Sequence, residues 1–255
     1  MSLPARSRST GSAAQVSSDL AKFPRPSVAV DVALLTTIEP DEASAAGNGQ
    51  VLAVLLQQRS SAPSKGDWGL PGSFVRERER LADAVLRTLA DKCAIEGLAP
   101  QQLRVFDDPA RDERGWVLTV AHLATVPAET VLEAIKDRAD LTLAPLLPST
   151  GDGPTRPIED LALPGRQRSL PFDHAGILDL AVADLRNRYR SAPDPDGLVA
   201  QPFSLLGLRR THEAVLGETL QKDTFRRQMN PGIEEFNAWS DGTVGRPARL
   251  YRKLS

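Results

Sequence analysis

The sequence of 255 residues is poor in the side chains from which disulfides and metal clusters are built. It has one cysteine, Cys93, which excludes a disulfide within the chain and a cysteine-based zinc site. Its three histidines are widely scattered, which argues against a histidine-rich metal site. We therefore expect neither a resident metal nor a cofactor.

Long hydrophobic runs and a strong net charge are also missing. No run approaches the roughly 18 apolar residues of a transmembrane helix, and the Ser- and Ala-rich start lacks the apolar core of a secretory signal. We expect a cytoplasmic protein with a flexible tail at residues 1–24, for which a transit peptide is the alternative. The net charge of −2 excludes a uniformly basic nucleic-acid binder but not a locally basic face.

Strand and helix patterns are mixed through residues 25–190, which is typical of an α+β domain. Residues 191–201 are rich in proline and lack apolar periodicity, so we expect them to be a linker. Residues 202–255 form a separate module. The first two expected strands form a hairpin. The expected strands are 27–39, 51–58, 103–106 and 116–126, and the expected helices are 81–94, 129–140 and 177–190.

A proline-glycine turn and the helix after it resemble the Nudix box. Leu70-Pro71-Gly72 matches the lead-in of that motif, and Glu79 and Arg87 follow at the spacing of its first Glu and its Arg. The rest of the motif is degenerate. The positions that depart from the family pattern are Ser73, Thr88, Asp91, Lys92 and Ala94.

The degenerate positions carry a chemical consequence. Positions 88, 91 and 92 share one helix face, where three carboxylates would bind a divalent cation that activates water. This chain has Thr88, Asp91 and Lys92 there, one carboxylate beside a fixed positive charge. We therefore expect no useful hydrolysis of nucleoside diphosphates. The alternatives are a simple solvated helix face, and an active hydrolase supported by Glu79 and Asp91.

Three arginines are candidates for binding an anionic ligand, because guanidinium groups suit phosphate oxygens. Arg59 ends a strand like that of the Nudix family, and the loop with Arg111 and Arg114 resembles one in its ADP-ribose-recognising branch. For each arginine a solvated loop charge is the alternative. Trp68 either stacks on a base or packs in the core. The predicted ligand-binding residues are Arg59, Trp68, Gly72, Arg87, Arg111 and Arg114.

Phe172-Asp173-His174 resembles a motif of the same branch. Taken by themselves, Asp173 is predicted to be the N-cap of the following helix and His174 a residue of its first turn.

The C-terminal module has a helix-turn-helix pattern. Ser204 is the expected N-cap of a first helix that Gly217 ends. A second helix is expected from about Asp223, as N-cap, to Met229, with Phe225 and Met229 facing inward. Residues 233–239 and the basic segment 242–255, joined by a turn, predict a β-hairpin wing.

Charge separates this module from the rest of the chain. From Pro202 onward nine Lys and Arg stand against six Asp and Glu, a net +3, so the preceding residues carry −5. Clustered cations on a recognition helix and a wing favour duplex DNA as the partner, and an adaptor that binds a protein is the alternative. The predicted DNA-binding residues are Lys222, Thr224, Arg226, Arg227, Gln228, Arg246, Arg249 and Arg252.

The combination of a degenerate Nudix box with these C-terminal motifs resembles the NrtR family, Nudix-related transcriptional regulators of NAD metabolism. The resemblance is strongest at Phe172–His174, Phe225–Met229 and Gly245–Arg252, whereas the stretch 145–164 departs from the family. It implies a Nudix-type α/β/α sandwich followed by a winged helix. It also implies a homodimeric repressor that binds a palindromic operator of NAD-synthesis genes, responds to ADP-ribose or a related nucleotide, and has lost hydrolysis.

Overall fold

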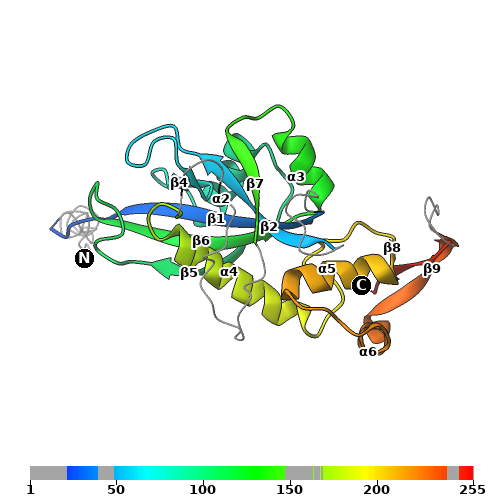
Figure 1. The fold of residues 1–255 in the computed structure, drawn as a ribbon. Helices are drawn as coiled ribbons and strands as arrows, with labels where there is room; N and C mark the ends of the chain where they lie inside the picture. The colour runs from blue at the N-terminus through cyan, green and yellow to red at the C-terminus, as the bar shows by residue number, and fades with distance from the viewer. Residues whose placement is uncertain are drawn as a thin grey trace, which may run out of the picture.

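The computed structural model describes residues 22–39, 49–146, 163, 167, 169–239 and 247–254 (Figure 1). Most of the predicted N-terminal tail and the loop of the first hairpin lie outside these residues. The stretch 147–162 and the turn of the predicted wing also lie outside them. No helix within the described part is long and apolar enough to cross a membrane.

The main sheet is built around β1 (Ser27–Ile38), a strand buried along almost its whole length. It pairs antiparallel with β2 (Val51–Gln58) and in parallel with β6 (Val117–Thr125). Both faces of β1 are covered, which explains why its sequence is a continuous apolar run instead of an alternating one. The sheet order is β3-β2-β1-β6-β5. The remaining strands are β3 (Trp68–Gly69), β4 (Gly72–Phe74) on β1, β5 (Gln101–Phe106), and β7 (Leu141–Pro145) on β2.

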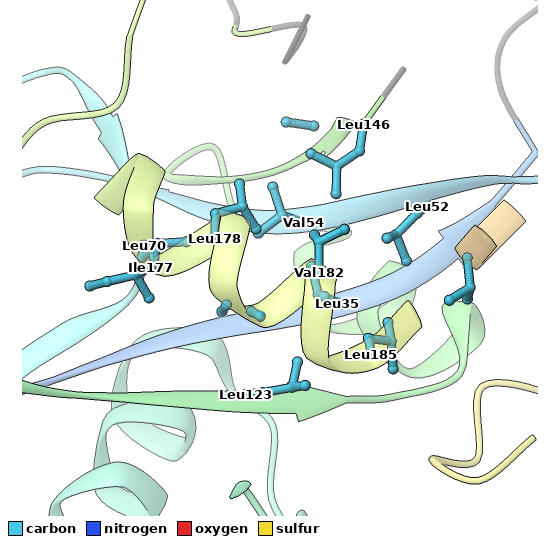
Figure 2. Packing of buried hydrophobic residues seen from close by; sticks show 14 of the residues in the cluster. Leu35, Leu52, Val54, Leu70, Leu123, Leu146, Ile177, Leu178, Val182 and Leu185 are labelled. Carbon is cyan, nitrogen blue, oxygen red and sulfur yellow. The ribbon is translucent and has the colours of Figure 1, made fainter. Parts of the chain in front are cut away.

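Helices cover the two faces of this sheet. Val30, Val32 and Leu34 of β1 pack on the side of α2 (Leu81–Cys93) and α3 (Ala128–Ile135), where they share a buried cluster with residues of both helices. Ala33 and Leu35 point to the opposite side, toward α4 (His174–Tyr189). Figure 2 shows α4 lying over that second cluster. The predicted α/β/α sandwich is therefore confirmed.

In the sheet domain the expected helices and longer strands agree with the observed ones except near α3. The helix predicted at 129–140 ends at Ile135, and the chain then forms β7, which was not predicted. A strand of five residues has no periodicity of its own. It exists because its backbone pairs with β2, a contact between distant parts of the sequence.

The C-terminal module is a winged helix. Its elements are β8 (Phe203–Ser204), α5 (Leu205–Leu216), α6 (Lys222–Met229), a 3-10 turn (Asn230–Gly232), β9 (Ile233–Trp239) and β10 (Arg249–Lys253). The strands form a sheet in the order β8-β10-β9. Phe225 and Met229 of α6 are buried in its core, as predicted.

The ends of the two helices follow local chemistry. The Ser204 hydroxyl accepts the Gly207 N–H at 3.0 Å, and Gly217 ends α5 with a φ of 71°. The predicted N-cap Asp223 is wrong, because Gln221 takes that position: its side-chain oxygen accepts the Thr224 N–H at 2.6 Å. Asp223 therefore lies in the first turn of α6, where a negative charge suits the helix dipole.

A buried joint connects the winged helix to the sheet domain. Asp194 is 1% exposed, and its carboxylate accepts bonds from the Tyr189 hydroxyl at 2.6 Å and the Leu198 N–H at 2.8 Å. Its own N–H donates to Nε2 of His212 on α5. Helix α5 also packs on α4 and β2, and Val215 belongs to the large core cluster (Figure 1). The predicted linker is thus a closely bonded turn, and the domain boundaries at 190 and 202 stay predictions.

Candidate ligand cavity and nucleic-acid interface

A cavity of about 550 Å³ opens beside the Leu70-Pro71-Gly72 turn. Its volume lies in the usual range for small-molecule sites. Four of the six predicted ligand-binding residues line it, namely Arg59, Gly72, Arg111 and Arg114. The structure thus brings together a strand end, a turn and a loop that are far apart in the sequence.

Trp68 and Arg87 lie outside the lining of this cavity. Trp68 is a residue of β3 and packs against the core on the α4 side. Arg87 donates from two nitrogens to the Glu79 carboxylate, at 2.6 and 2.8 Å, and from Nη2 to the Phe74 carbonyl at 3.1 Å. The bond from Arg87 lowers the pKa of Glu79 to about 2. The Glu79–Arg87 pair therefore holds the loop before α2, and the assignment of Trp68 and Arg87 to ligand binding stays a prediction.

Arg111 is held by carboxylates at the back of the cavity. Its side chain is 4% exposed and donates to both oxygens of Asp173, at 2.8 and 2.7 Å, and to Asp31 at 3.4 Å. Asp173 stands at the N-cap position of α4, but its side chain makes no capping bond. The predicted N-cap position of Asp173 is confirmed, but its carboxylate bonds Arg111 instead of capping the helix.

His174 ties the start of α4 to the turn. Its Nδ1 accepts the Leu70 N–H at 3.0 Å, so the ring proton lies on Nε2, which faces Asp31 at 3.6 Å. Burial raises the pKa of Asp31, but the facing His174 and Arg111 outweigh this effect and hold the pKa below its usual value. Asp31, buried in the middle of an apolar strand, was missed from the sequence. An acidic residue within such a run is the signal that could have found it.

Two guanidinium groups lie close to one aromatic ring at the cavity. The Arg59 guanidinium lies 4.7 Å from the centre of the Phe172 ring, and that of Arg114 lies 5.7 Å from it. Arg114 is also paired with Asp112, at 2.6 Å. Arg59 donates to the Pro63 carbonyl and has no carboxylate within ion-pair distance among the described residues. Its charge is therefore available to an anionic ligand.

The three degenerate positions on the Nudix helix, 88, 91 and 92, do not share one solvated face. Thr88 is 1% exposed and donates to the Ala84 carbonyl, while Asp91 is exposed. Lys92 alone of the three lines the cavity, and its Nζ donates to the Gly72 carbonyl. Within the described residues, no group of three or more His, Cys, Asp or Glu is placed to hold a metal ion. The donor set here does not fit a divalent cation.

The predicted recognition helix presents its polar residues to solvent. All five predicted contacts on α6, which are Lys222, Thr224, Arg226, Arg227 and Gln228, are exposed. Gln228 also donates to the Arg190 carbonyl at the end of α4. In the part of the chain that the structure covers, Arg226 and Arg227 have no ion-pair partner, so their charges are open to a polyanion.

The wing arginines are paired with carboxylates of the neighbouring strand. Arg249 contacts Glu235, and Arg252 Nε donates to Glu234 at 2.6 Å. Strand pairing places Glu234 opposite Arg252, a juxtaposition that charge counting along the sequence missed. Both pairs are exposed, so they are weak and exchangeable. The predicted contact Arg246 lies outside the described residues.

Comparison with known proteins accounts for both parts of the chain. Residues 197–253 match the family model of the NrtR DNA-binding winged helix domain. Over 233 residues the chain is 31% identical to a protein of Acinetobacter baylyi named ADPR responsive transcriptional repressor NtrR, covering 90% of this chain and 83% of that protein. The chain belongs to the NrtR family.

Solved structures show the same architecture. The crystal structure of Shewanella oneidensis NrtR complexed with a 27mer DNA is 30% identical with a TM-score of 0.70, covering 89% of this chain and 93% of that one. A MutT/nudix family protein from Enterococcus faecalis is 25% identical with a TM-score of 0.72, covering 96% of this chain and 95% of that one. This NrtR-family chain therefore has the Nudix-like sheet domain and the winged helix that its sequence predicted.

Proposed function

We propose that this NrtR-family chain is a transcriptional repressor of NAD-synthesis genes whose affinity for operator DNA is set by ADP-ribose. The observation that carries the proposal is the match along nearly the whole chain to a repressor named as ADPR responsive. It is supported by a cavity lined by cations in the sheet domain and by an exposed basic helix in the winged helix.

The DNA-binding surface is α6 together with the hairpin of β9 and β10. Arg226 and Arg227 enter the major groove and contact bases or phosphates, and Arg249 and Arg252 exchange their glutamate partners for phosphates. Two chains form a homodimer, so that two copies of α6 meet the two halves of a palindromic operator.

The ligand-binding surface is the cavity beside the Leu70-Pro71-Gly72 turn. Arg59 and Arg114, which both lie near the Phe172 ring, contact the diphosphate or the riboses. Because no metal-binding donor set is found among the described residues, we propose that the bound nucleotide is sensed and not hydrolysed.

Helix α4 connects the two surfaces. Its first residue, His174, bonds the turn at the cavity, and its last residue, Tyr189, bonds Asp194 in the joint with the winged helix. A ligand that favours one position of α4 over another would shift the winged helix accordingly. The change in DNA affinity cannot exceed the difference in the binding free energy of the ligand between the two arrangements.

The test is a gel shift of the full chain with DNA from upstream of NAD-synthesis genes, with and without ADP-ribose. We expect a sequence-specific complex whose affinity changes at least severalfold with ADP-ribose, and no AMP released from ADP-ribose in the presence of Mg²⁺ or Mn²⁺. Robust turnover would instead support an active hydrolase. Failure to bind any such DNA would support a protein-binding adaptor.

A further inference from the structure

Of the three degenerate positions on the Nudix helix, 88, 91 and 92, Lys92 is the one that lines the cavity. In an active Nudix box this face of the helix carries carboxylates for a divalent cation, and a cation there would act on a bound diphosphate. Here Thr88 points into the protein and Asp91 into solvent, whereas the Lys92 ammonium reaches the cavity and donates to the Gly72 carbonyl. The place of a carboxylate and its metal is thus taken by a fixed positive charge.

The ammonium is poised for an anion. One of its three N–H donors is used by the Gly72 carbonyl, which leaves two for a ligand. No carboxylate of the described residues lies within ion-pair distance of Lys92. Burial lowers the pKa of Lys92; the negative charge of Asp31 opposes this effect without cancelling it, and the positive charge of Arg59 adds to it. A negatively charged ligand would offset both the burial of the ammonium and its repulsion by Arg59.

The ion pairs in the cavity show which cations remain for a ligand. Arg111 is paired with both Asp173 and Asp31, so that its one positive charge faces two carboxylates, and Arg114 is paired with Asp112. Among the cations that line the cavity, this leaves Arg59 and Lys92 without a carboxylate partner in the described part of the chain. The diphosphate of a nucleotide such as ADP-ribose carries two negative charges at neutral pH. Arg59 and Lys92 are therefore the lining cations that have no ion pair to exchange before they contact these two negative charges.

We propose that Lys92 replaces the divalent cation of Nudix enzymes as the partner of the diphosphate, so that this chain binds ADP-ribose without any metal. The inference rests on the proposed function, because it concerns the same cavity and ligand. It makes Lys92 a ligand-binding residue that also explains how affinity for a nucleoside diphosphate persists after the metal site is lost.

The test is calorimetric titration of the full chain with ADP-ribose, in EDTA and in Mg²⁺. The unsubstituted chain should bind equally well in both. A charge-assisted bond contributes enough that Lys92→Gln should weaken binding about ten- to a hundredfold in both buffers, and Lys92→Arg should keep most of the affinity. The matched control is Lys136→Gln, which removes an exposed lysine at the end of α3.

The outcomes separate the two hypotheses. Binding that requires Mg²⁺, or an unchanged affinity in Lys92→Gln, would overturn the role of Lys92 while leaving ADP-ribose sensing intact. No binding of ADP-ribose by the unsubstituted chain would overturn the proposed function and this inference with it. Thermal unfolding of each variant checks that lost affinity is not lost structure.

Discussion

At the scale of a single residue, Gly72 shows how tightly the cavity is built. A Cβ at this position would lie 1.9 Å from Oδ1 of Asp31 and 2.9 Å from the Val30 carbonyl. The first of these contacts is with the carboxylate that faces His174 and Arg111. The resemblance to the Nudix box located this glycine, but its reason, the close approach of the turn to β1, is a fact of packing.

We expect Gly72→Ala to destabilise the protein by about 1–3 kcal/mol, the usual cost of forcing extra volume into a packed site. The added methyl group displaces Asp31 and with it the buried contacts to Arg111. Urea denaturation followed by fluorescence measures the change. Gly49→Ala is the control, because a Cβ there meets nothing within 4 Å. Equal stability of the two variants would contradict the packing argument.

At the scale of an element, α6 combines an inner and an outer face in eight residues. Phe225 and Met229 anchor it in the core of the winged helix, while Arg226 and Arg227 stay exposed. The i, i+4 spacing of the two apolar residues predicted this division correctly, because a single helical turn sets it. The N-cap was predicted two residues too late, since the side chain of Gln221 and not that of Asp223 caps the helix.

We expect the double variant Arg226→Ala, Arg227→Ala to lose at least tenfold in operator affinity. Each lost contact between a cationic side chain and a phosphate also reduces the slope of log affinity against log salt concentration by about 0.9. Fluorescence anisotropy at several salt concentrations measures both quantities. Arg76→Ala, Arg78→Ala removes the same charge from an exposed loop of the sheet domain and should leave both unchanged. Equal effects of the two variants would indicate only a general charge effect.

At the scale of the whole molecule, His212 lies buried where the two parts of the chain meet. It is fully buried, its Nε2 accepts the Asp194 N–H, and its Nδ1 donates to the Tyr189 carbonyl. The bond that Nε2 accepts needs the neutral ring, whereas Nδ1 donates to the carbonyl in either charge state. Burial lowers the pKa of His212 to about 4, below the usual value of 6.5.

The protein should therefore lose stability as the pH falls from about 6.5 to about 4, because the unfolded chain takes up a proton at His212 that the folded chain refuses. Below about 4 both states are protonated and the loss levels off. The shifted pKa of His212 lowers the free energy of unfolding by roughly 3 kcal/mol at pH 4 relative to pH 7. The measurement is urea denaturation of the unsubstituted chain and of His212→Gln from pH 7 to pH 4. The difference in their free energies of unfolding isolates the effect of His212, since both chains share all other titratable groups. A constant difference between the two chains would contradict this assignment.

The sequence by itself determined the elements and the family. Local periodicity, caps and turn residues were enough for the strands around β1, for α2, α4 and α5, and for the wing, because these signals act over a few neighbouring residues. The degenerate Nudix box and the basic C-terminal module together indicated the NrtR family.

Only the tertiary structure decided which charges are free. Arginines that look alike in the sequence have different roles: Arg87 holds a loop and Arg111 is buried between carboxylates, whereas Arg59 is unneutralised among the described residues. Strand pairing, which joins distant residues, placed Glu234 against Arg252. Folding also turned Thr88 inward and Lys92 toward the cavity. Charge balance at a site depends on neighbours in space, and sequence order does not contain them.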